Sequence, residues 1–278
     1  MTAHDMDAMV LKPVGVVRCA FASPGEVPVE GGPAIIEVHP EFGDGLEGIE
    51  RSSHIVLLAW LHRADRNVLM ARPRKLDLGT PPCGVFASRA PVRPNPIGLT
   101  VVRLVARNGL RLSVDPLDLI DSTPILDIKS YAPGWDGVYA ARAARRVPQS
   151  RLRNHYLLAF LQRELRNHMG ALHAAPAAGI ALAAVFMAIR GLDVDARDPA
   201  LRMATNRFDA GVDALMGLTG ALLSEERLRV VVDEHPRWFR FEKGSHTMTL
   251  TVRQEEGFPS DPADWDTQGF VTTHQACH

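Results

Sequence analysis

The 278-residue sequence is poor in the features that mark disulfide-rich, metal-binding or membrane proteins. Its three cysteines, Cys19, Cys83 and Cys277, lie far apart without a Cys-x-x-Cys pair, so neither a disulfide framework nor a cysteine metal site is indicated. The most apolar run, AAPAAGIALAAVFMAI, is shorter than a membrane span and consists largely of alanine. The acidic N-terminus lacks the apolar core of a signal peptide. We therefore expect a cytoplasmic protein without a membrane anchor.

The chain also lacks an excess of charge of either sign. Lys+Arg 31 against Asp+Glu 32 gives a net charge of -1, so there is no global basic field that would attract nucleic acid. Only a local basic patch could serve that purpose. The hydrophobic share of 46% is that of an ordinary globular protein, and the length suffices for two domains.

Two halves with different patterns predict an α+β protein of two domains. Short runs rich in Val, Ile, Leu and Phe fill residues 13–131 and favour a small all-β barrel: VGVVRCAF, PAIIEV, HIVLLAWLH, CGVFAS, LTVVRLVA and LRLSV. From about residue 152, apolar residues recur at helical spacing, and three strand-like runs follow. We expect a barrel domain at 13–140, a basic connector at 141–153 and an α+β domain at 154–253. The ends, 1–12 and 254–278, are expected to be loosely ordered tails.

The stretch GVFASRAPVRPNPIGLTVVRL, residues 84–104, places a stiff cationic loop between two apolar runs. Its three prolines fix three φ angles, so the loop loses little entropy on binding a ligand. Arg89 and Arg93 offer forked donors suited to a carboxylate or phosphate. Alternatively, the arginines are solvated and the prolines only prevent edge pairing. The residues alone leave both interpretations open.

Four blocks in this order resemble the TrmO (YaeB-like, TsaA-type) family over residues 13–135. They are VGVVR at 14–18, LEGIERSSHIVLLAWLHR at 46–63, the loop at 84–104 and LDLIDSTPILDIKSY at 117–131. The resemblance implies a small β-barrel enzyme that uses S-adenosylmethionine (SAM) and releases S-adenosylhomocysteine. It further implies N6-methylation of threonylcarbamoyladenosine at tRNA position 37, by a homodimer with the cofactor near the subunit interface.

The same resemblance implies a set of cofactor-binding residues. In this picture Arg89 pairs with the methionyl carboxylate, Asp118 accepts from the ammonium or the adenosine edge, and Leu99 covers the adenine. The full set comprises Pro28, Val29, Glu30, His62, Arg63, Arg89, Leu99, Asp115, Pro116, Leu117 and Asp118.

Candidate catalytic residues lie in the last of the four blocks. Methyl transfer is an in-line displacement, so alignment supplies much of the rate and no covalent nucleophile is expected. Asp127, Lys129 and Tyr131 could include a proton acceptor for the substrate nitrogen. Alternatively, this block is a structural turn that Asp121 caps by Asx-type hydrogen bonds.

Some positions depart from the family pattern. Val29 stands where a basic residue is common, and the RNA-associated C-terminal extension of the family is absent. Five arginines in the connector could contact phosphates instead, or they could be a solvated linker: Arg142, Arg145, Arg146, Arg151 and Arg153.

Residues 155–253 show a weaker resemblance, to FmdE-like domains. It is carried by HAAPAAGIALAA at 173–184 and FDAGVDALMGLTGALL at 208–223, where Asp209 is a candidate helix N-cap. Alanines stand at the positions of the reactive or metal-binding cysteines: Ala175, Ala210 and Ala221. Alanine cannot ligate a metal, so no metal site is expected, His168 and His173 notwithstanding.

Three functions therefore remain open from the sequence. The first is a methyltransferase that acts on tRNA, and the second transfers the methyl group to a small-molecule acceptor reached through the C-terminal domain. The third is a non-catalytic SAM-binding sensor.

Overall fold

The computed structural model describes residues 10–72, 81–138 and 148–276 and divides into two compact units. Among the described residues, the first unit comprises 10–72 and 81–138, and the second comprises 148–276. No helix in these ranges is long and apolar enough to cross a membrane.

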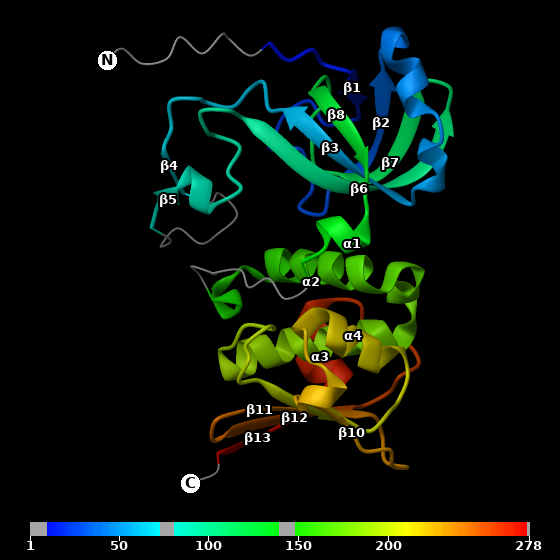
Figure 1. Ribbon diagram of the computed structural model, residues 1–278. Helices are drawn as coiled ribbons and strands as arrows, with labels where there is room; N and C mark the ends of the chain where they lie inside the picture. The colour runs from blue at the N-terminus through cyan, green and yellow to red at the C-terminus, as the bar shows by residue number, and fades with distance from the viewer. Residues whose placement is uncertain (1–9, 73–80, 139–147, 277–278) are drawn as a thin grey trace. The chain divides into compact units, whose positions relative to one another are not determined.

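Six antiparallel strands of the first unit close into a barrel, as predicted (Figure 1). They are β1 (Gly15–Arg18), β2 (Gly32–Val38), β3 (His54–Trp60), β6 (Ile97–Asn108), β7 (Arg111–Leu117) and β8 (Pro124–Ser130). Their order around the barrel is β1-β2-β7-β6-β3-β8, and pairing of β1 with β8 closes it. Closure leaves no sheet edge open to another chain.

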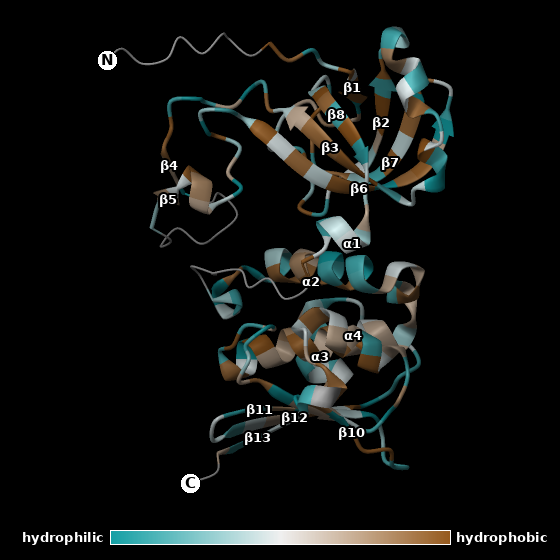
Figure 2. Ribbon diagram, viewed as in Figure 1, coloured by the Kyte–Doolittle hydropathy of each residue, from teal (hydrophilic) through white to brown (hydrophobic). Residues whose placement is uncertain are grey.

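Alternation along the strands builds the barrel core. Ile55, Leu57 and Ala59 of β3 are fully buried, whereas Leu58 between them points outward and is half-buried. Ile36 and Ile125 complete the interior from β2 and β8. Figure 2 shows hydrophobic residues recurring along these strands. Each fully buried Ile or Leu side chain of this core contributes about 2 kcal/mol through removal of apolar surface from water.

One of the predicted barrel strands is wrong, and one strand of the actual barrel was not predicted. The run CGVFAS forms the two-residue strand β5 (Cys83–Gly84), which pairs with β4 (Met70–Ala71), and then the 3-10 turn η3 (Val85–Ala87). The sixth barrel strand is β8, in which a register shift opposite Leu58 and Ala59 places Ile125 and Ile128 on the inner face and so breaks the alternation. Shorter elements of this unit are η1 (Pro40–Leu46), η2 (Ile49–Arg51) and α1 (Pro133–Asp136).

The second unit has three helices on one side of a five-stranded sheet, in agreement with the predicted α+β composition; one helix packs on the sheet and the other two pack on that helix. The helices are α2 (Asn154–Met169), α3 (Pro176–Leu192) and α4 (Ala210–Thr219). The strands are β9 (Arg202–Thr205), β10 (Leu228–Val230), β11 (Trp238–Lys243), β12 (His246–Val252) and β13 (Phe270–Ala276), in the order β10-β9-β11-β12-β13. Phe239, Phe241 and Leu250 lie on the inner face, in one apolar cluster with α3.

The expected loose tail after residue 253 is wrong. β13 pairs with β12 along its whole length, from Val252 opposite Phe270 to His246 opposite Ala276. Trp265 and Phe270 are buried, and the indole of Trp265 packs edge-on against Phe186 of α3. Two large aromatic side chains anchor this otherwise polar segment. The turns before β13 are η7 (Pro262–Asp264) and η8 (Trp265–Gly269).

The predicted connector also ends earlier than expected. Gln149 and Leu152, in and after the turn η4 (Gln149–Arg151), are buried in the second unit. Arg151 and Arg153 are exposed there, whereas Arg142, Arg145 and Arg146 lie outside the described residues. The remaining turns are η5 (Gly170–Ala174) and η6 (Leu223–Glu225).

Candidate functional site

The loop between η3 and β6 presents Arg89 at the surface of the barrel unit. Nη2 of Arg89 donates to the carbonyl oxygen of Leu99 at 2.5 Å, which ties the side chain to the first half of β6. Within the described part of the chain, no carboxylate pairs with Arg89. A guanidinium that is anchored but not neutralised is suited to an anionic ligand group.

Arg93, which the sequence analysis treated as a second ligand donor, has a different role. Its Nη2 donates to the carbonyl oxygens of Val85 (2.9 Å) and Ser88 (2.7 Å), and its Nε donates to that of Ala90 (2.9 Å). Ser88 and Ala90 flank Arg89 in the chain. Arg93 therefore holds the backbone on both sides of Arg89, and its prediction as a ligand-binding residue is corrected.

We predict that Arg93→Lys weakens binding at Arg89 although Arg93 need not touch the ligand. A lysine ammonium cannot reproduce three forked hydrogen bonds, so the loop loses its fixed conformation and ordering it costs binding energy. Affinity for S-adenosylhomocysteine should fall about 10-fold. Calorimetric titration measures this effect, and an unchanged affinity would contradict the positioning role. Arg51→Lys, at an exposed arginine of the same unit, is the control.

The end of β3 lies at the base of the same loop. Leu61 donates its backbone N–H to the carbonyl of Pro96 at 2.7 Å, and Nε of Arg66 donates to that of Pro94 at 3.0 Å. The guanidinium of Arg66 also lies 5.4 Å from the ring centre of Trp60. These contacts place the exposed residues His62 and Arg63 next to the C-terminal end of the proline-rich loop.

Arg63 connects this region to the segment that leads into β2. Its Nη1 donates to the carbonyl of Ala22 at 2.8 Å. Farther along that segment, Gly31 has a φ of +83°, and a Cβ at this position would lie 2.8 Å from the carbonyl oxygen of Leu117. Only glycine allows this approach, which places the predicted residues 28–30 beside Leu117 and Asp118.

Leu99 lies on the outer face of β6 in an exposed apolar strip. The strip consists of Ile97, Leu99 and Val101, which are 38%, 50% and 43% exposed. β7 runs antiparallel to β6 with Leu104 opposite Val114, so the Leu117 end of β7 points toward the Leu99 half of β6. An apolar strip beside the anchored Arg89 is suited to the flat ring of a nucleoside.

The Asp115 side chain lies on the same outer face of the barrel as this strip, because its partner Arg103 alternates with Leu99 and Val101 along β6. It pairs with Nη2 of Arg103 at 3.6 Å and lines a shallow groove of about 400 Å³ on the outer barrel wall. Of the predicted cofactor residues, Asp115 alone lines that groove, together with Arg18, Pro33, Ala34, Ile35, Arg103, Val105, Ser113 and Val114. Most of the predicted set therefore lies at one end of the barrel, and Arg103 holds the carboxylate of Asp115 on the same outer face as Leu99 and Val101. Pro116 follows Asp115 in β7.

Asp127 and Lys129 form an ion pair on the outer face of β8. Nζ of Lys129 lies 2.6 Å from Oδ2 of Asp127, and this contact raises the pKa of Lys129. Lys129 is therefore a cation near neutral pH and cannot accept a proton. Asp127 stands opposite Leu58 of β3, which stands opposite Leu99 of β6. Two strand spacings, about 10 Å, therefore separate the backbones of Asp127 and Leu99.

His54 is a candidate proton acceptor that the sequence analysis missed. Burial and the nearby charge of Arg103 lower the pKa of its imidazole, so the ring is neutral near neutral pH and can accept a proton. Its carbonyl oxygen accepts the backbone N–H of Tyr131 at 3.1 Å, which places both residues at the same end of β3 and β8. The pattern SSHIV in the second block could have pointed to it.

The second unit offers no comparable set of ligating groups. Ala175 and Ala210 lie at the starts of α3 and α4, and Ala221 is fully buried. Nδ1 of His173 contacts the carbonyl of Gly170 at 2.6 Å, and the ring of His168 packs against Gly217. Across residues 10–72, 81–138 and 148–276, no three His, Cys, Asp or Glu side chains form a group that could hold a metal ion.

Comparisons with known proteins match the barrel unit. A family model described as the tRNA-methyltransferase O N-terminal domain matches residues 16–137. A protein of Pyrococcus abyssi described as a probable S-adenosyl-L-methionine-binding protein is 44% identical over 130 residues, which cover 45% of this chain and 69% of that protein. An S-adenosyl-L-methionine-binding protein of Archaeoglobus fulgidus is 40% identical, with 47% of this chain and 94% of that protein covered.

A solved structure is similar to the same part of the chain. The crystal structure of TrmO from Pseudomonas aeruginosa shares 36% identity, covers 50% of this chain and gives a TM-score of 0.41. The match spans 63% of that chain, which is less than two thirds of its length.

Proposed function

Because the chain belongs to the family of the tRNA-methyltransferase O N-terminal domain, we propose that its barrel unit is an S-adenosylmethionine-dependent methyltransferase. The observation that carries the proposal is the anchored Arg89, which pairs with no carboxylate of the described chain and adjoins the apolar strip of Ile97, Leu99 and Val101. The cation suits the carboxylate of the amino-acid end of this cofactor, and the exposed apolar surface suits the adenine of its nucleoside end.

The chain's own residues would hold the cofactor at these two ends. Arg89 binds the carboxylate of the amino-acid part through a charge-assisted hydrogen bond, in the conformation that Arg93 fixes. Leu99 covers one face of the adenine. Asp118, next to the turn at Gly31, accepts from the ammonium or from the adenosine edge. When bound, the cofactor supplies an electrophilic methyl group.

A proton must leave the acceptor nitrogen when it gains the methyl group. Two groups are candidates to take this proton. Asp127 of β8 is level with Leu99 across β3, and His54 of β3 stands opposite Arg103, four residues further along β6. The lowered pKa of His54 keeps its ring neutral and therefore able to accept a proton. Lys129, held as a cation by Asp127, would orient an anionic group of the acceptor rather than remove a proton.

The acceptor that we propose is N6 of threonylcarbamoyladenosine at position 37 of tRNA. The description of the matched family as a tRNA-methyltransferase domain supports tRNA as the acceptor. The choice of this nucleotide follows from the resemblance of the four sequence blocks to the TrmO family. To test this choice of acceptor, the full chain is incubated with methyl-labelled SAM and total tRNA. One tRNA sample carries the threonylcarbamoyl group and the other lacks it. We expect label only in the modified tRNA, and none with Arg89→Gln. Label confined to small molecules would contradict this choice of acceptor and leave the methyltransferase in place.

We further propose a cytoplasmic homodimer with the cofactor near the subunit interface, so that the partner covers the part of the strip of Ile97, Leu99 and Val101 that the adenine leaves exposed. Contiguous exposed apolar residues on a barrel wall support an interface, because such surface is costly in water. Light scattering during gel filtration measures the oligomeric state, and a monomer at micromolar concentration would contradict the dimer. For the second unit, we propose an FmdE-like scaffold without thiol chemistry, since alanines occupy the three aligned positions.

A further inference from the structure

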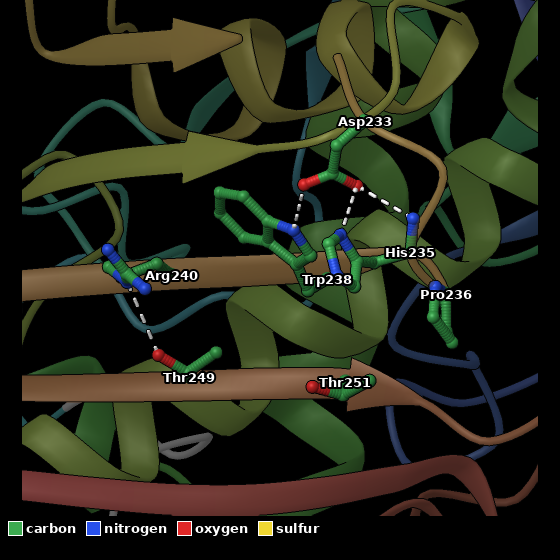
Figure 3. A pocket seen from close by; sticks show the side chains of 7 residues that line it. All are labelled: Asp233, His235, Pro236, Trp238, Arg240, Thr249 and Thr251. Atoms are coloured by element: carbon green, nitrogen blue, oxygen red, sulfur yellow. Dashed lines mark hydrogen bonds and ion pairs between the residues drawn. The ribbon is translucent and has the colours of Figure 1, made fainter. Parts of the chain in front are cut away.

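The outer face of the sheet in the second unit carries a pocket that the proposed methyl transfer does not use (Figure 3). Trp238 and Arg240 belong to β11, the central strand, and stand opposite Thr251 and Thr249 of β12. The intervening Phe239 is buried on the helix side, so these four side chains point away from the helices. The pocket has a volume of about 410 Å³ and is lined by Asp233, His235, Pro236, Trp238, Arg240, Thr249 and Thr251.

Three flat side chains follow one another along this pocket. The guanidinium of Arg240 lies 5.4 Å from the ring centre of Trp238. Asp233 links the indole to the imidazole, because Oδ2 accepts from Nε1 of Trp238 at 3.3 Å and Oδ1 lies 3.4 Å from Nδ1 of His235. Figure 3 shows the indole between Arg240 and His235. A row of planar groups offers a surface on which another flat ring can stack.

Buried polar groups fix the loop that carries Asp233 and His235. Asn206 has no exposed surface, donates from Nδ2 to Oδ1 of Asp233 at 2.7 Å and accepts the backbone N–H of Trp238 at 2.9 Å. Arg207 donates to the carbonyl oxygens of Asp233 (2.6 Å) and His235 (2.7 Å). The pocket therefore needs little ordering when a ligand binds.

The charges leave one cation available at the end of the row. Arg240 makes a 3.4 Å contact from Nε to Oγ1 of Thr249 and pairs with no carboxylate in the described ranges. In contrast, Arg229 on the same face pairs with Glu226 at 3.3 Å, and Arg202 stands opposite Glu242. Asp233 is already hydrogen-bonded by Asn206 and Trp238, which together with other donors lower its pKa, so it holds the rings in place. The open position suits one oxyanion, next to a flat ring.

We propose that this pocket binds one nucleotide of a single-stranded RNA. The base stacks on the Trp238–His235 side, the Arg240 guanidinium binds a phosphate, and the hydroxyls of Thr249 and Thr251 hydrogen-bond to base edges or sugar. The His235 side chain is 79% exposed, so the pocket does not enclose a small molecule, whereas a polymer can extend along the open sheet face. The choice of RNA rests on the proposed tRNA acceptor.

Fluorescence anisotropy with the full chain and a short fluorescein-labelled single-stranded RNA of mixed sequence tests the proposal. We expect Trp238→Ala and Arg240→Gln each to weaken binding about 10-fold, since stacking and a phosphate contact are lost. Trp238→Phe retains a stacking ring and should bind nearly as well as the wild type, and a wild-type circular dichroism spectrum of Trp238→Ala excludes misfolding as the cause of its loss. Arg229→Gln removes the same charge from a paired arginine and is the matched control.

Two further titrations distinguish RNA binding at this pocket from cofactor binding at the barrel. Calorimetry with S-adenosylhomocysteine should give the wild-type affinity for Trp238→Ala, whereas Arg89→Gln should lose cofactor binding but keep RNA binding. Wild-type RNA affinity in Trp238→Ala and Arg240→Gln would overturn the proposal, as would no binding of RNA by the wild type. Competition by adenosine monophosphate as strong as that by the oligonucleotide would also overturn it, in favour of a free nucleotide.

Discussion

Arg89→Gln should bind S-adenosylhomocysteine about 100-fold more weakly than the wild type, at an unchanged unfolding temperature. The substitution removes a charge-assisted hydrogen bond to the ligand carboxylate, and such bonds contribute about 2 to 3 kcal/mol. Arg89 is exposed, and its one contact to Leu99 leaves the barrel core untouched, so the fold should persist. Calorimetric titration and a thermal melt give both quantities.

Arg51→Gln is the control for this prediction, because Arg51 is an exposed arginine of the same unit in the turn η2. Its affinity for S-adenosylhomocysteine should equal that of the wild type. If Arg89→Gln also retained the wild-type affinity, the contact to Leu99 would be purely structural and the carboxylate would bind elsewhere.

Asp209→Ala should destabilise the second unit by about 3 kcal/mol. The carboxylate of Asp209 caps α4 by accepting the N–H of Gly211 at 2.9 Å and pairs through both oxygens with Arg237, at 3.2 and 2.7 Å. Arg237 is 5% exposed, so its charge would lose a partner in a poorly hydrated place, with Glu255 at 3.0 Å left to compensate. Of the total of about 3 kcal/mol, loss of the helix cap accounts for about 1 kcal/mol.

Urea unfolding followed by circular dichroism measures this loss in the transition of the second unit. Asp213→Ala, an exposed carboxylate in the first turn of the same helix, should change the stability by no more than about 0.5 kcal/mol. Equal stability of the Asp209→Ala and Asp213→Ala proteins would contradict the role assigned to the buried ion pair.

Acid should act on the same network. Burial raises the pKa of the Asp209 carboxyl, but Arg237 and the N–H of Gly211 outweigh it, so the pKa in the folded state lies below the ordinary value. The stabilisation is therefore complete above the unfolded pKa of about 3.9 and is lost as the pH falls through the folded value. On acidification below pH 5, the free energy of unfolding should therefore fall less in Asp209→Ala than in the wild type, as urea unfolding at a series of pH values measures.

Much of the barrel could be predicted from the sequence, because its strands alternate apolar and polar residues between turn signals. β8 was missed since Pro124 starts it and a register shift puts Ile125 and Ile128, three residues apart, on the inner face, which breaks the alternation. The last strand, β13, was missed because Phe270 and Val271 are its only large apolar residues, and its place depends on pairing with β12 and on the anchor Trp265. Such tertiary pairing leaves little local signal.

In the candidate site, too, the sequence predicts which residues are present, but their roles depend on tertiary contacts. Arg89 and Arg93 have the same side chain in the same proline-rich loop, so the sequence offered no reason to assign them different roles. The structure separates them through hydrogen bonds, since Arg93 donates to three loop carbonyls and Arg89 to one outside the loop. Gly31 beside Leu117 likewise joins segments that are distant in the sequence, through an approach that only the fold reveals.

A crystal structure of the full chain grown with S-adenosylhomocysteine tests the central claim most directly. We expect the ligand carboxylate on the guanidinium of Arg89 and the adenine against Leu99, with Arg93 still bonded to the loop backbone. Arg89 directed into solvent, with the ligand absent from this end of the barrel, would contradict the account.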